Sequence, residues 1–262
     1  MKRAVTALVA GGLAITAVLF LDSDVNLIVV AVLMAGGGYE ITVLARAGSA
    51  SSALLPLLPA AVFGLSILWL LEPRLALGWL VASPLIYAFA MVWSRGEPRS
   101  RLLALGWLSF ATPYLVLPSW SIYEIHLRSP GLLVVFLMGV WANDCAAYYV
   151  GSALGKHKMS PILSPKKTWE GSVAGLVGGL LMALVGLSWL NGGWSWTGLW
   201  VFVLVIAAAQ SGDLVESLLK RAVGVKDSGT LLPGHGGILD RLDAIILSAP
   251  VFCALVRYAD SQ

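Results

Sequence analysis

Charged residues are scarce in this chain of 262 residues. Asp, Glu, Lys and Arg together make up 12% of the sequence, whereas they make up about 25% of an ordinary soluble domain. Hydrophobic residues account for 58%, and several apolar runs reach the roughly 20 residues that a helix needs to cross a bilayer. These runs are continuous, whereas a soluble helix alternates apolar and polar faces. The composition therefore argues against a soluble domain and predicts an integral membrane protein.

The number of cysteines and the net charge are also low, and each argues against one class of function. Cys145 and Cys253 lie in separate apolar segments, so they provide neither a zinc-binding spacing nor a disulfide framework. The formal net charge of +3 is too small to indicate nucleic-acid binding. We therefore expect the membrane bilayer, and no nucleic acid, as the surroundings and partner of the protein.

The apolar runs predict an all-α fold, a polytopic bundle of about nine transmembrane helices. We expect one integral membrane domain over residues 1–262, with N-terminal helices in 1–130 and catalytic helices in 131–262. Prolines mark many of the expected ends, among them Pro118. The expected spans are 4–21, 25–46, 53–71, 74–93, 102–118, 130–150, 171–190, 196–215 and 239–258.

Basic residues are distributed unevenly between alternate connections. If the N-terminus is cytoplasmic, all of the 17 basic residues except Arg74, Arg128 and Arg257 fall on the cytoplasmic side. Cytoplasmic loops of membrane proteins are rich in Lys and Arg. The bias predicts a cytoplasmic N-terminus in the cell membrane, and it places two long polar loops, 151–170 and 216–238, together on the cytoplasmic face. We expect the active site there.

Acidic residues recur at helical spacing near these loops. Asp213 and Glu216 are three residues apart, as are Asp240 and Asp243, so each pair lies on one face of a helix. Paired carboxylates from two helices offer the oxygen ligands that Mg²⁺ prefers. Acids at a membrane boundary are costly and usually functional. Structural ion pairs of Asp213 and Asp240 with Lys220 and Arg241 are the alternative.

Several basic residues are expected beside these acids. Arginine binds phosphate oxygens in a bidentate fork, and lysine supplies a point charge, so a metal–polyphosphate site is the favoured interpretation. The alternative is that these residues only satisfy the positive-inside bias or contact anionic lipid. The set comprises Lys166, Lys167, Lys220, Arg221, Lys226 and Arg241.

Glycines surround a histidine just before Asp240, in the loop from Pro233 to Gly237. Gly236 and Gly237 let backbone N–H groups approach a phosphate closely. His235, between glycines, is suited to donate to a phosphate or to orient an acid. The loop therefore predicts a phosphate contact.

The segment Ser164 to Gly171 has two interpretations. Lys166 and Lys167 are suited to bind a nucleotide triphosphate. Alternatively, Thr168 caps the next helix and Trp169 anchors it at the membrane interface.

Two acids lie within apolar helices, where an ionisable residue is a site candidate by default. Asp144 is assigned to the site, and Glu40, which has no evident partner in the sequence, is not assigned.

These motifs resemble the phosphatidate cytidylyltransferase family, also called CDP-diacylglycerol synthase. The family signature has the form S-x-x-K-R-x4-K-D-x-G-x3-P-x-H-G-G-x-x-D-R-x-D, and the resemblance covers about residues 140–255. The chain departs from the family pattern in Cys145 and Ala146, which follow Asp144, and in Ala244, which follows the last Asp of the signature. The signature is matched here by Ser217, Lys220, Arg221, Lys226, Asp227, Gly229, Pro233, His235, Gly236, Gly237, Asp240, Arg241 and Asp243.

The resemblance implies an enzyme that converts CTP and phosphatidic acid into CDP-diacylglycerol and pyrophosphate, with Mg²⁺ held by Asp213 and Asp240. It also suggests a K⁺ ion beside the Mg²⁺ and a homodimer. We expect catalytic roles for Asp213, Asp240, Lys220, Arg221, Lys226, Asp227, His235, Arg241 and Asp243. We expect substrate contacts from Asp144, Ser164, Lys166, Lys167, Thr168, Glu216, Ser217, Gly236 and Gly237.

Other classes fit the sequence less well. A transporter would place charges near the midplane of the membrane and often shows internal repeats, whereas the charges here gather at one face. An enzyme that uses CTP with an ether-lipid phosphate is a closer alternative. An inactive scaffolding homologue is disfavoured because the signature is intact.

Overall fold

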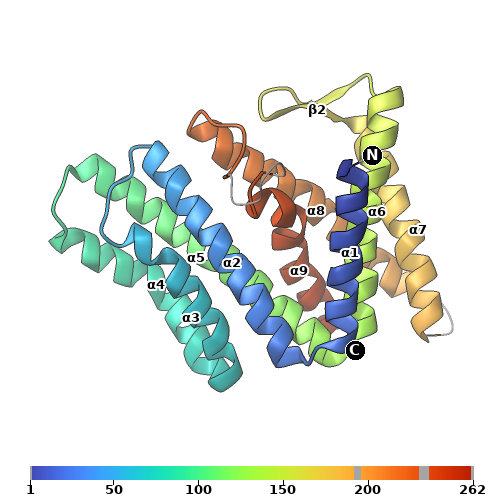
Figure 1. The fold of residues 1–262 in the computed structure, drawn as a ribbon, viewed down its shortest axis with the longest axis horizontal. Coiled ribbons are helices and arrows are strands. Elements are labelled where there is room, and N and C mark those ends of the chain that lie inside the picture. The colour runs from blue at the N-terminus through green and yellow to red at the C-terminus, as the bar shows by residue number, and fades with distance from the viewer. Residues whose placement is uncertain (1, 192–195, 230–235, 261–262) are drawn as a thin grey trace.

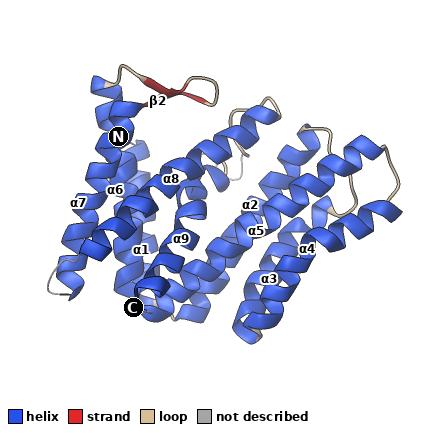
Figure 2. Ribbon diagram, turned by 180° about the vertical axis from the view of Figure 1, so that it is seen from behind, coloured by secondary structure: helices blue, strands red, loops and turns tan. Residues whose placement is uncertain are grey.

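The computed structural model describes residues 2–191, 196–229 and 236–260, which fold almost entirely into helices (Figure 1). Figure 2, from behind, shows a single small hairpin as the only strands among them. The predicted all-α fold is therefore confirmed for the described residues. The elements are α1 (Lys2–Phe20), α2 (Ser23–Ala47), the 3-10 helix η1 (Leu55–Leu57), α3 (Leu58–Leu71), α4 (Pro73–Trp93), α5 (Pro98–Arg128), α6 (Pro130–Leu154), β1 (Lys158–Ser160), β2 (Ser164–Thr168), α7 (Trp169–Asn191), α8 (Trp196–Ala222) and α9 (Leu239–Asp260).

Seven helices in the described part of the chain are long and apolar enough to cross a bilayer, namely α2 and α4 to α9. The other apolar helical stretches, Gly11–Phe20 and Leu55–Leu71, are shorter. The polytopic character is thus supported. The count of nine spans and the cytoplasmic N-terminus stay predictions.

Proline begins several helices. Pro73, Pro98 and Pro130 are the first residues of α4, α5 and α6, where the missing N–H would have no partner within the helix in any case. Ser129 adds a cap to α6, because its Oγ accepts a hydrogen bond from the N–H of Leu132 at 3.2 Å.

The expected break at Pro118 is wrong, because α5 continues through it to Arg128. The hydroxyls of Ser119 and Ser121 donate to backbone carbonyls four residues earlier. Such local bonds from Ser and Thr help a membrane helix to tolerate proline. The predicted span 102–118 therefore covers only part of a helix of 31 residues.

Both predicted polar loops contain regular structure. α8 continues to Ala222, so the first residues of the predicted loop 216–238 are helical. Within 151–170, β1 and β2 form an antiparallel hairpin in which Lys158 pairs with Thr168. The basic side chains of these segments are consequently displayed by a helix and a strand.

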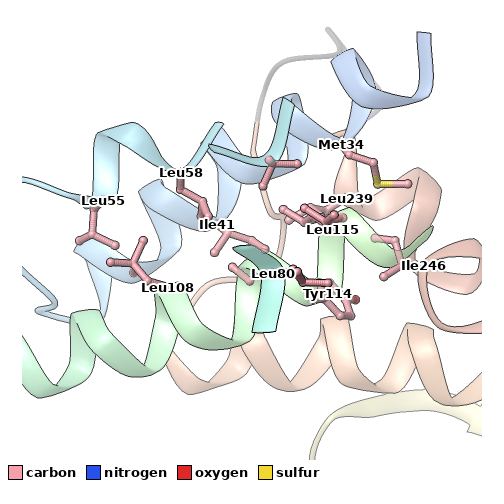
Figure 3. Close-up of a cluster of buried hydrophobic side chains, with 14 of the residues drawn as sticks. Met34, Ile41, Leu55, Leu58, Leu80, Leu108, Tyr114, Leu115, Leu239 and Ile246 are labelled. Atoms are coloured by element: carbon pink, nitrogen blue, oxygen red, sulfur yellow. The ribbon is translucent and has the colours of Figure 1, made fainter. Parts of the chain in front are cut away.

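The last helix, α9, lies between two groups of helices (Figure 1). It packs against α5 on one side and against α8 on the other. Leu239 at its start belongs to the same buried cluster as Met34 of α2 (Figure 3). Farther along, Phe252 stacks on Phe136 of α6 with ring centroids 5.1 Å apart. The helix that carries Asp240 is therefore held by both groups.

Small residues let α6 and α7 approach closely at Gly178. A Cβ atom built on Gly178 would lie 2.7 Å from the Cβ of Ala146 and 3.3 Å from the carbonyl oxygen of Ala142. Glycine at such contacts allows helix backbones to pack in a membrane. This packing places the carboxyl-terminal end of α6 beside the hairpin.

Substitution of Gly178 tests this packing. We expect Gly178→Ala to lower the thermal unfolding midpoint in detergent, because overpacking costs about 1–3 kcal/mol. Gly78→Ala in α4 is the control, since nothing lies within 4 Å of its Cβ position and alanine favours a helix by about 1 kcal/mol over glycine. Equal midpoints for the two variants would contradict the close contact.

Candidate active site

The two polar segments that the sequence predicts to be neighbours meet at one end of the bundle. Lys167 of β2 places its Nζ 2.6 Å from a carboxylate oxygen of Asp213 on α8. Arg221, near the end of α8, donates from Nε to the carbonyl oxygen of Leu163 at 3.4 Å. The hairpin is therefore joined to α8 at two points, and the predicted convergence is confirmed.

Lys220 joins two acids from different helices. Its Nζ lies 2.8 Å from Oε2 of Glu216, one turn earlier on α8, and 2.5 Å from Oδ1 of Asp240 on α9. The side chains of Lys220, Glu216 and Asp240 are 12%, 1% and 16% exposed. Because buried charges need opposite charges or hydrogen bonds, this triad ties α8 to α9. The alternative of a structural ion pair between Asp240 and Lys220 thus holds in the structure.

The second oxygen of Asp240 also has several donors. Oδ2 accepts hydrogen bonds from the N–H of Gly237 at 2.9 Å and from the N–H and hydroxyl of Ser228 at 3.3 and 3.1 Å. The N–H of Gly237 therefore points at Asp240. Contacts of Gly236 and Gly237 with a phosphate stay predictions. His235 lies outside the described residues.

A second acidic group surrounds Lys167. Asp144 of α6, Asp213 of α8 and Asp243 of α9 lie close enough for their charges to interact, with Lys167 near them. α8 and α9 are tightly packed here, because a Cβ on Gly212 would overlap the carbonyl oxygen of Asp243. The acids therefore divide by position in the fold, with Asp213 beside Asp243 and Glu216 beside Asp240.

A chain of side-chain amides holds Asp144. Asn143 donates from Nδ2 to Oδ1 of Asp144 at 2.9 Å, and Gln210 of α8 donates from Nε2 to Oδ1 of Asn143 at 2.8 Å. Gln210 also donates to the backbone carbonyl of Ser172 on α7 at 2.9 Å. The sequence analysis did not identify Asn143 and Gln210 as residues that hold Asp144. The signal was present, because a polar amide within an apolar membrane helix usually hydrogen-bonds to a neighbouring helix.

Thr168 has the structural role that the sequence offered as an alternative. Its side chain is buried, and its Oγ1 accepts a hydrogen bond from the N–H of Gly171 at 3.2 Å, so it caps the start of α7. Trp169 is 56% exposed, as an interfacial anchor requires. A substrate contact of Thr168 stays a prediction.

The remaining predicted residues lie on β2, on α8, in the segment after α8 and on α9. Ser164 and Ser217 are half-buried, whereas the charged residues are exposed and accessible to a soluble ligand. Their catalytic and binding roles stay predictions. The exposed residues are Lys166, Lys226, Asp227 and Arg241.

Two buried polar atoms in the described site have no hydrogen-bond partner. They are Oε1 of Glu216 and the hydroxyl of Tyr114 on α5, and Tyr114 lies close enough to Glu216, Asp213 and Asp243 to interact with their charges. Buried polar atoms usually have partners, so these two atoms are candidates for contact with a polar group of a ligand. The sequence did not identify Tyr114.

The acids fit a hard cation by their chemistry. No three Asp, Glu, His or Cys side chains in the described ranges are arranged to hold a metal by themselves. Asp213 and Asp240 each present carboxylate oxygens to a lysine ammonium, at 2.6 and 2.5 Å, and oxygen ligands are those that Mg²⁺ prefers. Phosphate oxygens and water would complete the ligand set, as is usual for this ion.

Known proteins match this chain along nearly its whole length. The model of the family described as "Cytidylyltransferase family" matches residues 1–259. The chain belongs to the cytidylyltransferase family. The family model spans both the N-terminal helices and the signature.

Curated relatives of this cytidylyltransferase carry the name phosphatidate cytidylyltransferase. The protein of that name from Mycobacterium bovis is 32% identical over 266 residues, covering 95% of this chain and 86% of the relative. The Pseudomonas aeruginosa protein is 34% identical over 222 residues, covering 77% of this chain and 71% of the relative. The Staphylococcus saprophyticus protein is 44% identical over 138 residues, which is 51% of this chain and 53% of the relative.

Removal of the Lys220 ammonium tests the triad in this cytidylyltransferase. We expect Lys220→Met to destabilise the protein by about 3–5 kcal/mol, because two buried carboxylates lose their counter-charge. Arg257→Met breaks the ion pair with Glu124, in which Arg257 is 58% exposed, and should cost less than about 1 kcal/mol. Thermal unfolding in detergent compares the stability of the two variants. An equal or larger loss of stability in Arg257→Met would refute the structural role assigned to the Lys220 triad.

Proposed function

We propose that this protein transfers the cytidylyl group of CTP to phosphatidic acid, giving CDP-diacylglycerol and pyrophosphate for phospholipid biosynthesis. The observation that carries the proposal is the convergence of acids and bases from α6, α8, α9 and the hairpin at one end of a bundle of membrane helices. A site at the end of such helices is accessible both to a water-soluble nucleotide and to a lipid head group. The family match and the names of the relatives support the same reaction.

The reaction requires charge neutralisation rather than a covalent protein intermediate. A phosphate oxygen of phosphatidic acid, anionic at neutral pH, forms a bond to the α-phosphorus of CTP. The bond from that phosphorus to the bridging oxygen breaks, and pyrophosphate leaves with the electron pair. Because both reactants are anions, catalysis depends on positioning them in line and on stabilising negative charge.

Basic side chains of this chain supply part of that stabilisation. Lys167 and Lys220 contact carboxylates, and each is placed to exchange this contact for a phosphate oxygen when the triphosphate binds. Arg221 is exposed at the end of α8, where its guanidinium can hold pyrophosphate oxygens in a fork. The hydroxyl of Tyr114 is available as a further donor.

The proposal includes Mg²⁺ held by Asp213 and Asp240. When bound there, the ion neutralises phosphate charge and orients the reacting groups. The family resemblance extends the proposal to a K⁺ ion near the same acids and to a homodimer. The division of the acids into two neighbouring groups around Lys167 and Lys220 supports more than one cationic position in the site.

Asparagine substitutions test the assigned acids. We expect Asp213→Asn and Asp240→Asn to abolish formation of labelled CDP-lipid from radiolabelled CTP, Mg²⁺ and phosphatidic acid, because each removes a carboxylate charge that the metal requires. Membrane insertion should be unaffected. Near-normal turnover by either variant would overturn the metal assignment.

The same assay, with an ether-lipid phosphate in place of phosphatidic acid, separates the two lipid classes. We expect the wild-type protein to label phosphatidic acid preferentially. Preference for the ether lipid would assign the protein to the other CTP-dependent reaction. Labelled product with neither lipid would refute cytidylyl transfer to a lipid phosphate.

The active site is proposed to face the cytoplasm, where CTP is found. Ile162, at the hairpin, is 86% exposed, so we expect Ile162→Cys, with Cys145→Ser and Cys253→Ser, to react with a membrane-impermeant maleimide in inverted vesicles and not in intact spheroplasts. Arg74→Cys in the same background should show the opposite pattern. The reverse result at both positions would invert the orientation.

A further inference from the structure

Glu40 is a buried acid of α2, 1% exposed, that accepts hydrogen bonds from the segment leading into α9. Its Oε1 accepts from the N–H of Ile238 at 2.8 Å. Its Oε2 accepts from the N–H of Leu239 at 3.0 Å and from the hydroxyl of Ser228 at 2.8 Å. One carboxylate therefore binds three donors that lie about 190 to 200 positions later in the chain.

These contacts cap α9 from another helix. The first N–H groups of a helix have no partner within that helix, and a negative charge near them is favoured by the helix dipole. A residue at the start of the helix usually accepts these bonds. Here Glu40 of α2 accepts two of them, so the position of α9 along its axis depends on α2.

Small residues on both sides make this contact possible. A Cβ built on Gly237 would overlap both Oε2 of Glu40 and the hydroxyl of Ser228, and one on Gly229 would lie 2.8 Å from Oε1 of Glu40. On α2, a Cβ on Gly36 would lie 2.5 Å from the side chain of Ile238. The glycines of the signature loop therefore leave room for the Glu40 carboxylate.

The same segment determines where Asp240 lies. Ser228 shares its hydroxyl between Glu40, at 2.8 Å, and Asp240, at 3.1 Å, and the N–H of Gly237 donates to Asp240 at 2.9 Å. Asp240 in turn contacts Lys220. A displacement of residues 236–240 would therefore be transmitted to the acid and the lysine on which the proposed reaction depends.

We propose that Glu40 is a positioning residue of the active site, which fixes residues 228 and 236–240 against α2 and so holds Asp240 in its working position. The expected effect of Glu40 on turnover rests on the proposed function, whereas its contacts with residues 228, 238 and 239 do not. We also assign a role to Gly229 and Gly237, which is to leave room for the Glu40 carboxylate in the loop.

Hydrogen–deuterium exchange and steady-state kinetics on the full-length protein test the proposal. Glu40→Gln keeps the size of the side chain, but it removes the charge and one of the two acceptor oxygens. We expect faster exchange in peptides that cover 236–240, together with a loss of kcat on the order of 10- to 100-fold, as misplacement of a reacting group produces. The KM for CTP should change much less, because the exposed basic residues are intact.

Thr42→Val is the matched control. Thr42 is a buried polar residue of the same helix, but its hydroxyl bonds to the carbonyls of Gly38 and Leu55 instead. We expect it to leave both the exchange of 236–240 and kcat unchanged. If Glu40→Gln does not accumulate, Ser228→Ala, which removes the shared hydroxyl, should show the same local increase in exchange with a smaller loss of kcat.

The outcomes separate this inference from the proposed reaction. Unchanged exchange at 236–240 in Glu40→Gln would overturn the contact, and faster exchange with unchanged kcat would overturn its role in positioning. An equal loss of kcat in Thr42→Val would mean that both substitutions act by general destabilisation, and it would also overturn the positioning role of Glu40. A wild-type protein without cytidylyl transfer would refute the proposed function, whereas the exchange comparison would still decide whether Glu40 holds the segment.

Discussion

Pairing of charge inside a helix bundle is the constraint on which this structure depends. Ionised groups removed from water are stable only with opposite charges or several hydrogen bonds. The triad of Lys220, Glu216 and Asp240 meets this requirement across α8 and α9. The contact of Lys167 with Asp213, whose side chains are more exposed, joins α8 to the hairpin. The charges that hold these elements together are also those that we propose to bind a metal and a triphosphate.

The N-terminal helices take part in the site as well as in the bundle. Glu40 of α2 accepts hydrogen bonds from the start of α9, and Tyr114 of α5 lies beside the acids. The buried cluster that includes Met34 and Leu239 packs α2 against the same end of α9 (Figure 3). The segment that matches the family signature therefore has its geometry set partly by residues outside it.

Local properties were predicted well where the physical cause is local. Within a bilayer, a helix provides a continuous apolar run with partners for all its backbone groups, and each expected span lies mainly within helical residues of the structure. Thr168 caps α7 because a hydroxyl before a helix can bond to its first turn. The prediction failed at Pro118, where α5 continues and the hydroxyls of Ser119 and Ser121 bond to carbonyls one turn earlier. It also failed at the end of α8, which continues to Ala222 and carries the ion pair of Lys220 with Glu216.

The sequence by itself determined the membrane class, the helical fold, the two polar segments and the helical spacing of their acids. Helical spacing indicates which residues share one face of a helix, but it does not indicate which other helix packs against that face. Only the tertiary structure therefore separated Asp213 from Glu216, paired Lys167 with Asp213, and brought Glu40 to Ile238 across 198 positions. Such contacts depend on how distant helices pack around α9, and no local pattern of residues encodes that packing.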